Sequence, residues 1–231
     1  MFTVALVGPD GAGKTTISRQ MEHLLPMPAK YVYMGVNLDS SNLVLPTTRL
    51  FLEIKRARGR RPDMAGPPDP TRVKPRPRGL IKRIAAGLKS GLRLLNQLGE
   101  EWFRQGIVWY YRRRGYVVVF DRHFFSDYYA HDIANDDPHR PLTGRIHGFI
   151  LKRLYPRPDL VICLDAPPEV LFARKREGTL ELLERRRQEY LRLRGQVKHF
   201  VTVDATRPQD EVTQAVVKHI LDFCRAEGGK P

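Results

Sequence analysis

Cysteines and long apolar runs are scarce in this sequence, and acidic residues are outnumbered by basic ones. Its 231 residues include two cysteines, Cys163 and Cys224, whose separation fits neither a disulfide framework nor a thiolate metal site. No apolar run approaches the roughly 18 residues of a membrane-spanning helix. The first strand-like segment begins so close to Met1 that no room is left for a cleaved signal peptide. These features favour a protein of the reducing cytoplasm.

The excess of positive charge is concentrated in one segment. Lys and Arg number 40 against 25 Asp and Glu, a formal net charge of +15. Residues 55–83 contain eleven basic and two acidic side chains, so they supply +9 of this total. Six prolines between residues 57 and 79 predict a loop. Three interpretations of this basic, proline-rich insertion stay open: a solvated loop, a loop that closes over a polyanionic substrate, or, less favoured, a contact with an anionic membrane or nucleic acid.

The most informative stretch is Gly-Pro-Asp-Gly-Ala-Gly-Lys-Thr, from Gly8 to Thr15. It satisfies the pattern G-x-x-x-x-G-K-[ST] of the phosphate-binding loop, or P-loop. The context fits, because a strand pattern precedes it and a helical pattern follows it. Glycines let backbone N–H groups approach an anion, and the helix N-terminus adds positive partial charge. We therefore expect Lys14 to reach the β- and γ-phosphates of a nucleotide and the Thr15 hydroxyl to hold Mg²⁺.

Short apolar segments alternate with helical patterns along the whole chain. Continuous apolar runs of this kind are typical of parallel strands that are buried on both faces. The pattern predicts a single α/β domain over residues 1–231, in which a doubly wound, parallel five-stranded sheet lies between two layers of helices. The predicted strands cover residues 2–7, 31–34, 116–120, 160–164 and 199–203, and helices are predicted after the P-loop and over 80–114, 146–154 and 208–224. Residues 38–54 are ambiguous in pattern and allow a helix over 47–56.

A helical stripe of apolar residues begins at Leu80, with basic residues beside it. Gly91 or Gly99 is expected to divide this region into two helices, of which the second covers residues 100–114. A basic amphipathic helix can lie on a membrane, but core packing is favoured here as the role of the stripe. Its members are Ile81, Ile84, Ala85, Leu88, Leu92, Leu95, Leu98 and Trp102.

Charged residues follow two of the predicted strands. Asp121 and Arg122 come directly after the strand at 116–120. An aspartate at this place can complete a Mg²⁺ shell, or cap a helix, and Arg122 can capture a phosphate or form a surface ion pair. Residues 174–187 are dense in arginine and glutamate. An arginine-rich lid over the transferring phosphoryl group is favoured there over a solvated helix with i,i+4 ion pairs.

A second group of charged residues lies between the third strand and the next helix. His131, Asp132, Asp136, Asp137 and His139 are potential metal ligands. Their spacing matches no regular helix face and the segment is loop-like, so we expect no dedicated metal site there.

These segments together resemble thymidylate kinase over about residues 1–35 and 100–225. The resemblance rests on the P-loop, on Asp121-Arg122-His123 with Ser126 five positions after the aspartate, on the turn at 164–170, on the charged lid, and on Val203-Asp204-Ala205-Thr206. It implies a nucleoside-monophosphate-kinase fold, ATP and Mg²⁺ as cofactors, and a small-molecule phosphate acceptor. The implied reaction moves the γ-phosphoryl group of ATP to a nucleoside monophosphate, dTMP to dTDP. It also allows a homodimer, which the family commonly forms.

The resemblance assigns roles by position. Asp10 would lie near the acceptor and Mg²⁺, Arg122 would hold the acceptor's phosphate, and the Ala205-Thr206 turn would border the adenine. Gly11 stands where some members have a loop arginine, so the lid would have to supply that charge. The implied catalytic residues are Lys14, Asp10, Arg122, Arg174 and Arg176; the implied cofactor-binding residues are Gly8, Pro9, Asp10, Gly11, Ala12, Gly13, Lys14, Thr15, Thr16, Ala205 and Thr206; and the implied metal ligands are Thr15 and Asp121.

The departures from the family concern the acceptor side. Residues 34–37 are Met-Gly-Val-Asn where the family usually has Thr-Arg-Glu-Pro, and Tyr129-Ala130-His131 replaces Ala-Tyr-Gln. Glu100 occupies the usual place of a base-reading arginine, with Arg104 one turn later. Two alternatives to a dTMP kinase therefore stay open. One is a kinase of a non-nucleotide, sugar-like acceptor, and the other is a P-loop ATPase recruited to anionic lipid or nucleic acid by residues 55–83.

Overall fold

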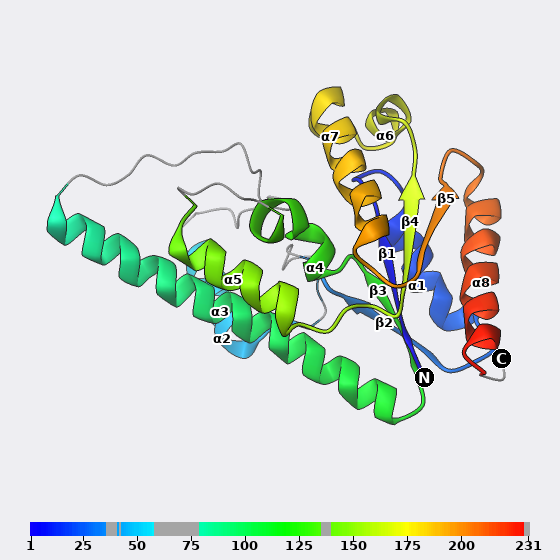
Figure 1. The fold of residues 1–231 in the computed structure, drawn as a ribbon, viewed down its shortest axis with the longest axis horizontal. Coiled ribbons are helices and arrows are strands. Elements are labelled where there is room, and N and C mark those ends of the chain that lie inside the picture. The colour runs from blue at the N-terminus through cyan, green and yellow to red at the C-terminus, as the bar shows by residue number, and fades with distance from the viewer. Residues whose placement is uncertain (36–40, 42, 58–78, 135–139, 229–231) are drawn as a thin grey trace.

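The computed structural model shows three layers, with one sheet between two sets of helices (Figure 1). It describes residues 1–35, 41, 43–57, 79–134 and 140–228. The sheet is parallel, and its strand order is β2-β3-β1-β4-β5. The strands are β1 Thr3–Val7, β2 Ala29–Tyr33, β3 Val117–Asp121, β4 Leu160–Asp165 and β5 Phe200–Asp204. The predicted doubly wound α/β fold is confirmed.

Alternating side chains of the strands build the two halves of the core. Val4 and Leu6 of β1 face one hydrophobic cluster, whereas Ala5 and Val7 face the other. The first cluster is covered by α1 Lys14–Leu24 and α8 Gln209–Ala226. The second is covered mainly by α3 Leu80–Arg113 and α5 Leu142–Arg153. Because β1, β3 and β4 in the middle of the sheet are buried on both faces, their sequences are almost continuous apolar runs, whereas the edge strand β5 is only partly buried.

Parallel pairing brings the carboxyl ends of the strands to one edge of the sheet. Leu6 near the end of β1 is in register with Asp121 of β3, and Asp165 of β4 is in register with Asp204 of β5. These aspartates are the last residues of their strands rather than the first residues after them. This edge is where ligands bind in open α/β sheets.

The region from Leu80 to Arg113 is one helix of 34 residues, so the expected break at Gly91 or Gly99 is wrong. A glycine costs only about 1 kcal/mol in a helix interior, and the turns on either side continue the pattern. The expected core role of the apolar stripe is also wrong for its first part, because Ile81, Leu88 and Leu95 are exposed. The buried side of α3 instead begins at Glu100.

Two further predictions need correction or fall outside the described residues. The loop-like segment after β3 contains α4 Phe124–Asp127 and a π-helical turn, η2 Tyr129–Ile133. Asp136, Asp137 and His139 lie outside the described residues. Over the part of the chain that is described, no group of three or more His, Cys, Asp or Glu residues could hold a metal ion.

The basic insertion is described only at its two ends. Its first residues belong to α2 Pro46–Ala57 and its last to α3, while residues 58–78 lie outside the described part. The arginine-rich segment 174–187 covers the end of α6 Pro168–Lys175, a turn, and most of α7 Leu180–Leu191, which η3 Arg192–Gly195 follows. Among the described helices, none has the length and hydropathy needed to cross a membrane.

Candidate active site

The P-loop connects β1 to α1 and packs tightly against β4 and α6. Gly8 and Gly11 have φ angles of +140° and +90°, which side chains rarely adopt. A Cβ atom at Gly8 would lie 2.4 Å from the carbonyl oxygen of Leu164, and one at Gly11 would lie 2.7 Å from that of Leu171. Glycine is therefore required at both positions, as in a loop whose backbone must approach a phosphate closely.

Lys14 starts α1 and is buried beneath this loop. Its Nζ donates a hydrogen bond of 2.6 Å to the carbonyl oxygen of Pro9. Burial, with a smaller contribution from the positive charge of Arg122, lowers the pKa of Lys14 to about 8. An anion in the cradle would add to the negative charge that Asp10 and Asp121 already place near this ammonium group.

Thr15 and Asp121 meet although 106 residues separate them. The Thr15 hydroxyl donates to Oδ2 of Asp121 at 2.6 Å, and the Tyr31 hydroxyl donates to the same oxygen at 3.3 Å. The other carboxylate oxygen of Asp121 is buried and has no hydrogen-bond partner. A buried carboxylate oxygen without a partner, beside a threonine hydroxyl, fits Mg²⁺, which takes few protein ligands and completes its shell with phosphates and water.

Two arginines from different elements converge on Asp10 of the P-loop. Arg122 forms an ion pair with Oδ1 of Asp10, and Nη1 of Arg186 lies 3.0 Å from Oδ2. Burial would raise the pKa of Asp10, but Lys14, Arg122 and nearby cations outweigh it and hold this pKa well below its usual range. The site thus gathers three cations and one carboxylate where a triphosphate would end.

The backbone of Arg122 is strained. Its φ angle is +68°, in the left-handed region that non-glycine residues seldom occupy. Such a conformation costs about 1–3 kcal/mol and persists only where the surroundings impose it. Here the N–H of Arg122 donates to the carbonyl of Leu6 at 3.0 Å, which turns the side chain toward the P-loop.

The lid arginines divide into those that reach the P-loop region and those that do not. Arg186 contacts Asp10, and Arg187 makes two hydrogen bonds, of 2.6 and 2.9 Å, to the carboxylate of Asp165. Arg174 donates instead to the carbonyl of Ala205 at 2.8 Å, and Arg176 is an exposed residue in the turn between α6 and α7. The structure therefore brings Arg186, which the sequence analysis did not single out, to the position expected for Arg174 or Arg176.

A helical-face argument could have found Arg186. Leu183 and Tyr190 are the buried residues of α7, and they mark its inner face. Arg186 and Arg187 lie three and four positions after Leu183, so they share that face.

The turn after β5 lies at the same edge of the sheet. Ala205 is buried, and its N–H donates to the carbonyl of Asp165 at 2.7 Å. Thr206 is exposed, and its hydroxyl donates to Asp204 at 2.6 Å. The hydrogen bond from Arg174 joins the lid to this turn.

About half of this chain is similar in sequence to known proteins. The chain is 35% identical over 116 residues to a probable thymidylate kinase of Archaeoglobus fulgidus, a match that covers 47% of this chain and 55% of that protein. It is 34% identical over 121 residues to a probable thymidylate kinase of Staphylothermus marinus, covering 48% and 56%, respectively. This chain is related to the thymidylate kinases.

A third relative gives the same result at lower identity. The probable thymidylate kinase 1 of Saccharolobus solfataricus is 28% identical over 111 residues, which are 45% of this chain and 54% of that protein. The chain thus spans about half the length of the curated thymidylate kinases that it matches. No family model matches the chain.

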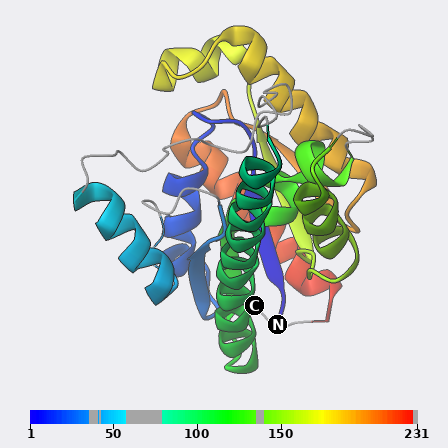
Figure 2. The ribbon, with the colours of Figure 1, turned by 90° about the vertical axis from the view of Figure 1, so that its left-hand side faces the viewer.

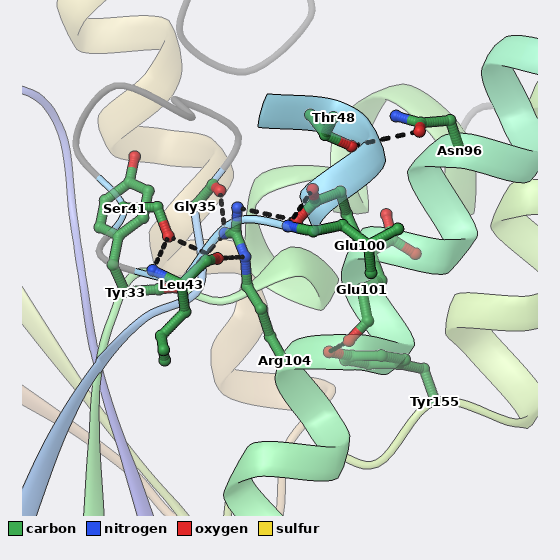
Figure 3. A network of polar contacts seen from close by, with 11 residues as sticks. Tyr33, Gly35, Ser41, Leu43, Thr48, Asn96, Glu100, Glu101, Arg104 and Tyr155 are labelled. Carbon is green, nitrogen blue, oxygen red and sulfur yellow. Dashed lines mark hydrogen bonds and ion pairs between the residues drawn. The ribbon is translucent and has the colours of Figure 1, made fainter. Parts of the chain in front are cut away.

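The acceptor side, where the sequence departs from thymidylate kinase, is held by a buried arginine (Figure 3). Arg104 is 0% exposed and donates to the carbonyls of Gly35 at 2.9 Å, Leu43 at 3.1 Å and Tyr33 at 3.3 Å. Its remaining nitrogen lies 3.5 Å from Glu100. The guanidinium group is thus occupied by the chain itself, on both sides of residues 36–40.

Glu100, which stands at the usual place of the base-reading arginine, belongs to the same network. Its Oε1 accepts a hydrogen bond of 2.8 Å from the N–H of Leu45, directly before α2. Nearby, the Thr48 hydroxyl of α2 donates to Asn96 of α3 at 3.1 Å. Glu100 and Arg104 therefore fasten the segment after β2 to α3.

A buried histidine between two carboxylates lies on the other side of α3. His147 of α5 makes hydrogen bonds of 2.6 Å to Asp132 and 2.8 Å to Glu101. Burial opposes the charge of this imidazole, but the bonds to both carboxylates outweigh it and raise the pKa of His147 to about 9. The cluster joins α3, η2 and α5 as a charged triad.

One more polar pair lies close to Arg122. The Tyr190 hydroxyl of α7 donates to Oδ1 of Asp127 at 2.9 Å, and both side chains are buried. Burial raises the pKa of Asp127, although Arg122 and the hydrogen bond from Tyr190 act in the opposite direction. This pair ties the base of the lid to α4, and the sequence pattern gave no signal for it.

Proposed function

We propose that this protein is an ATP- and Mg²⁺-dependent kinase of thymidylate-kinase type that phosphorylates a small, phosphate-bearing acceptor. The observation that carries the proposal is the convergence of Arg122 and Arg186 on Asp10, directly beside Lys14. Phosphoryl transfer needs positive charge around the transferred group and little covalent chemistry from the protein. The relationship to the thymidylate kinases supports the same reaction class.

Each residue then has a role in binding or charge stabilisation. The loop from Gly8 to Gly13, together with Thr16 in the first turn of α1, binds the phosphates of ATP through backbone N–H groups. Lys14 stabilises the negative charge on the β- and γ-phosphates. Thr15 and Asp121 would hold Mg²⁺, which would supply positive charge to the phosphates of the nucleotide. Arg122 holds the acceptor's phosphate, and Arg186 stabilises the transferring group.

The lid and the turn after β5 complete the nucleotide side. Ala205 and Thr206 border the adenine, and Arg174 fixes the lid to this turn through the Ala205 carbonyl. Arg176 ends α6 at the turn before α7, so its role is to shape the lid rather than to contact the phosphates. In the free protein Asp10 forms ion pairs with Arg122 and Arg186, and bound phosphates would replace Asp10 as the partner of these arginines.

For the acceptor, dTMP is the first candidate, because the matched relatives are named as probable thymidylate kinases. A non-nucleotide, sugar-like acceptor is the second candidate, and the Arg104 network supports it. Arg104 and Glu100 bond to each other and to the backbone, so neither offers a free group to a base. The third interpretation, a P-loop ATPase recruited by residues 55–83, depends on residues that lie mostly outside the described part.

The test is a panel of acceptors with ATP and Mg²⁺, scored by ADP release and by identification of the phosphorylated product. It should include dTMP, the other nucleoside monophosphates, nucleosides and sugar phosphates. Stimulation by dTMP alone supports the first candidate, and stimulation by a sugar phosphate alone supports the second. ADP release that no acceptor stimulates, with Lys14→Ala inactive, would reject the kinase in favour of an ATPase.

A further inference from the structure

Five large apolar side chains form a stripe along the outside of α3. Ile81, Ile84, Leu88, Leu92 and Leu95 are between 59% and 84% exposed. They recur at intervals of three and four residues, so they share one face of the helix. The buried residues of α3, which include Glu100, Arg104 and Val108, lie on the opposite face. We call these five residues the outer stripe.

The part of α3 that carries the outer stripe projects from the body of the protein. No described residue between 81 and 99 is buried, whereas the second half of the helix packs on the sheet. In Figure 1 this part extends to the far left of the molecule, beyond the sheet, and in Figure 2 it faces the viewer. Exposed apolar residues that are contiguous, rather than scattered singly, mark an interaction surface.

The sequence around the stripe carries charge of one sign only. Residues 70–99 contain eight basic residues and no acidic one. Lys89 and Arg93 are exposed. At 3.6 residues per turn, Lys89 lies at the flank of the outer stripe, whereas Arg93 is turned further, toward the side of the helix that carries Glu100 and Arg104. The first turn of α3 contains no acidic residue to balance the positive end of the helix dipole. The projecting half of α3 therefore presents apolar and positive groups together, as helices that lie in a membrane interface do.

From these observations we propose that the outer stripe of α3 binds the surface of an anionic phospholipid bilayer. The apolar side chains would enter the boundary between headgroups and acyl chains, and Lys89 at the flank of the stripe would extend to the phosphates. This goes beyond the proposed function, because none of the P-loop, Arg122, Arg186 or Asp121 takes part. It would bring the enzyme to a membrane while its active site stays at the edge of the sheet.

Charge separates this partner from a second copy of the chain. A copy docked on the same face would bring its own net positive segment against this one. Between residues 70 and 99 the sequence offers no carboxylate to pair with Lys89 or Arg93 across such an interface. An anionic bilayer supplies the complementary charge and a place for the apolar side chains at the same time.

The first experiment measures sedimentation of the full chain with vesicles. We expect binding to phosphatidylcholine vesicles that contain phosphatidylglycerol, and weak binding to phosphatidylcholine alone. Leu88→Gln should lower the partition constant by about tenfold or more, because it removes one inserted leucine. Leu154→Gln is the matched control, since Leu154, directly after α5, is 60% exposed and Leu88 on α3 is 67% exposed. Equal binding by both variants would overturn the proposal.

The second experiment tests the charge and the competing partner. Lys89→Glu should weaken binding to the anionic vesicles, whereas Lys152→Glu, at an exposed position on α5, should not. Binding that depends on Lys89 but not on Leu88 would contradict insertion of the stripe and would indicate simple charge attraction. Analytical ultracentrifugation supplies the other decisive result. A dimer that dissociates in Leu88→Gln, without vesicle binding by the wild type, would assign the stripe to a second copy.

Discussion

The guanidinium group of Arg186 lies 3.0 Å from the carboxylate of Asp10, although 176 residues separate them in the sequence. One residue comes from the lid and the other from the P-loop. Their contact places the arginine-rich helix α7 over the loop that would hold the nucleotide. Several consequences of this arrangement can be measured.

Arg186 and Arg176 should differ sharply when each is replaced by alanine. Arg186→Ala removes a cation from the P-loop region and should lower kcat/KM by about 10²-fold or more, the usual size for one stabilising donor. Arg176→Ala removes an exposed residue of the turn and should change kcat/KM little. Steady-state kinetics on both variants decides this. Equal losses would place the catalytic arginine elsewhere in the lid.

Lys14→Ala should lower turnover on the order of 10²–10³-fold, because the buried ammonium group would stabilise the negative charge on the β- and γ-phosphates during transfer. The pKa of Lys14 is about 8 in the free protein, so affinity for ATP should decline as the pH rises above 8. Calorimetric titration with a non-hydrolysable ATP analogue at several pH values measures this decline. The slope should be absent in Lys14→Met, and a slope that persists in that variant would assign it to another group.

The magnesium requirement should depend on the pair formed by Thr15 and Asp121. Thr15→Ala should raise the Mg²⁺ concentration for half-maximal activity by roughly 10- to 100-fold. Thr15→Ser keeps the hydroxyl and should restore most of the affinity. Activity measured against Mg²⁺ at saturating ATP makes the comparison, and a Thr15→Ala variant with an unchanged Mg²⁺ requirement would remove this residue from the metal site.

His147 should make the stability of the protein depend on pH. Its pKa is raised from 6.5 to about 9 in the folded state, so its contribution is complete below pH 6.5 and is lost as the pH rises through 9. The difference corresponds to about 3 kcal/mol in the free energy of unfolding. Urea unfolding of the wild type and of His147→Gln across this range tests it, with the exposed His23→Gln as the control. If the free energy of unfolding of His147→Gln fell with rising pH as steeply as that of the wild type, another group would be responsible.

Arg104 should act on stability and on the acceptor, and not on ATP. Arg104→Met leaves Glu100 and three backbone carbonyls without their partner, which should cost about 3–5 kcal/mol in the free energy of unfolding. In conditions where the variant is folded, KM for the acceptor should rise more than KM for ATP. Arg113→Met, at an exposed position of α3, is the control. A stable Arg104→Met variant with changed base selectivity would show that Arg104 reads the acceptor directly.

Much of the fold was predictable because the relevant signals are local. The P-loop pattern needs only eight consecutive residues, and a strand buried on both faces is apolar without interruption. All five strands were found to within about two residues. The break at Gly91 or Gly99 was wrong because a single glycine carries a small cost that neighbouring turns can offset.

The sequence by itself determined the parallel sheet, the P-loop, and the carboxylate and arginine at the end of β3, since each depends on residues close together in the chain. Only the tertiary structure decided that Arg186 is the lid residue that reaches Asp10, that Arg104 is bound by backbone carbonyls, and that the outer stripe of α3 faces away from the core. These outcomes depend on which helix faces meet. An apolar or charged periodicity defines a face of a helix, but it does not say what packs against that face.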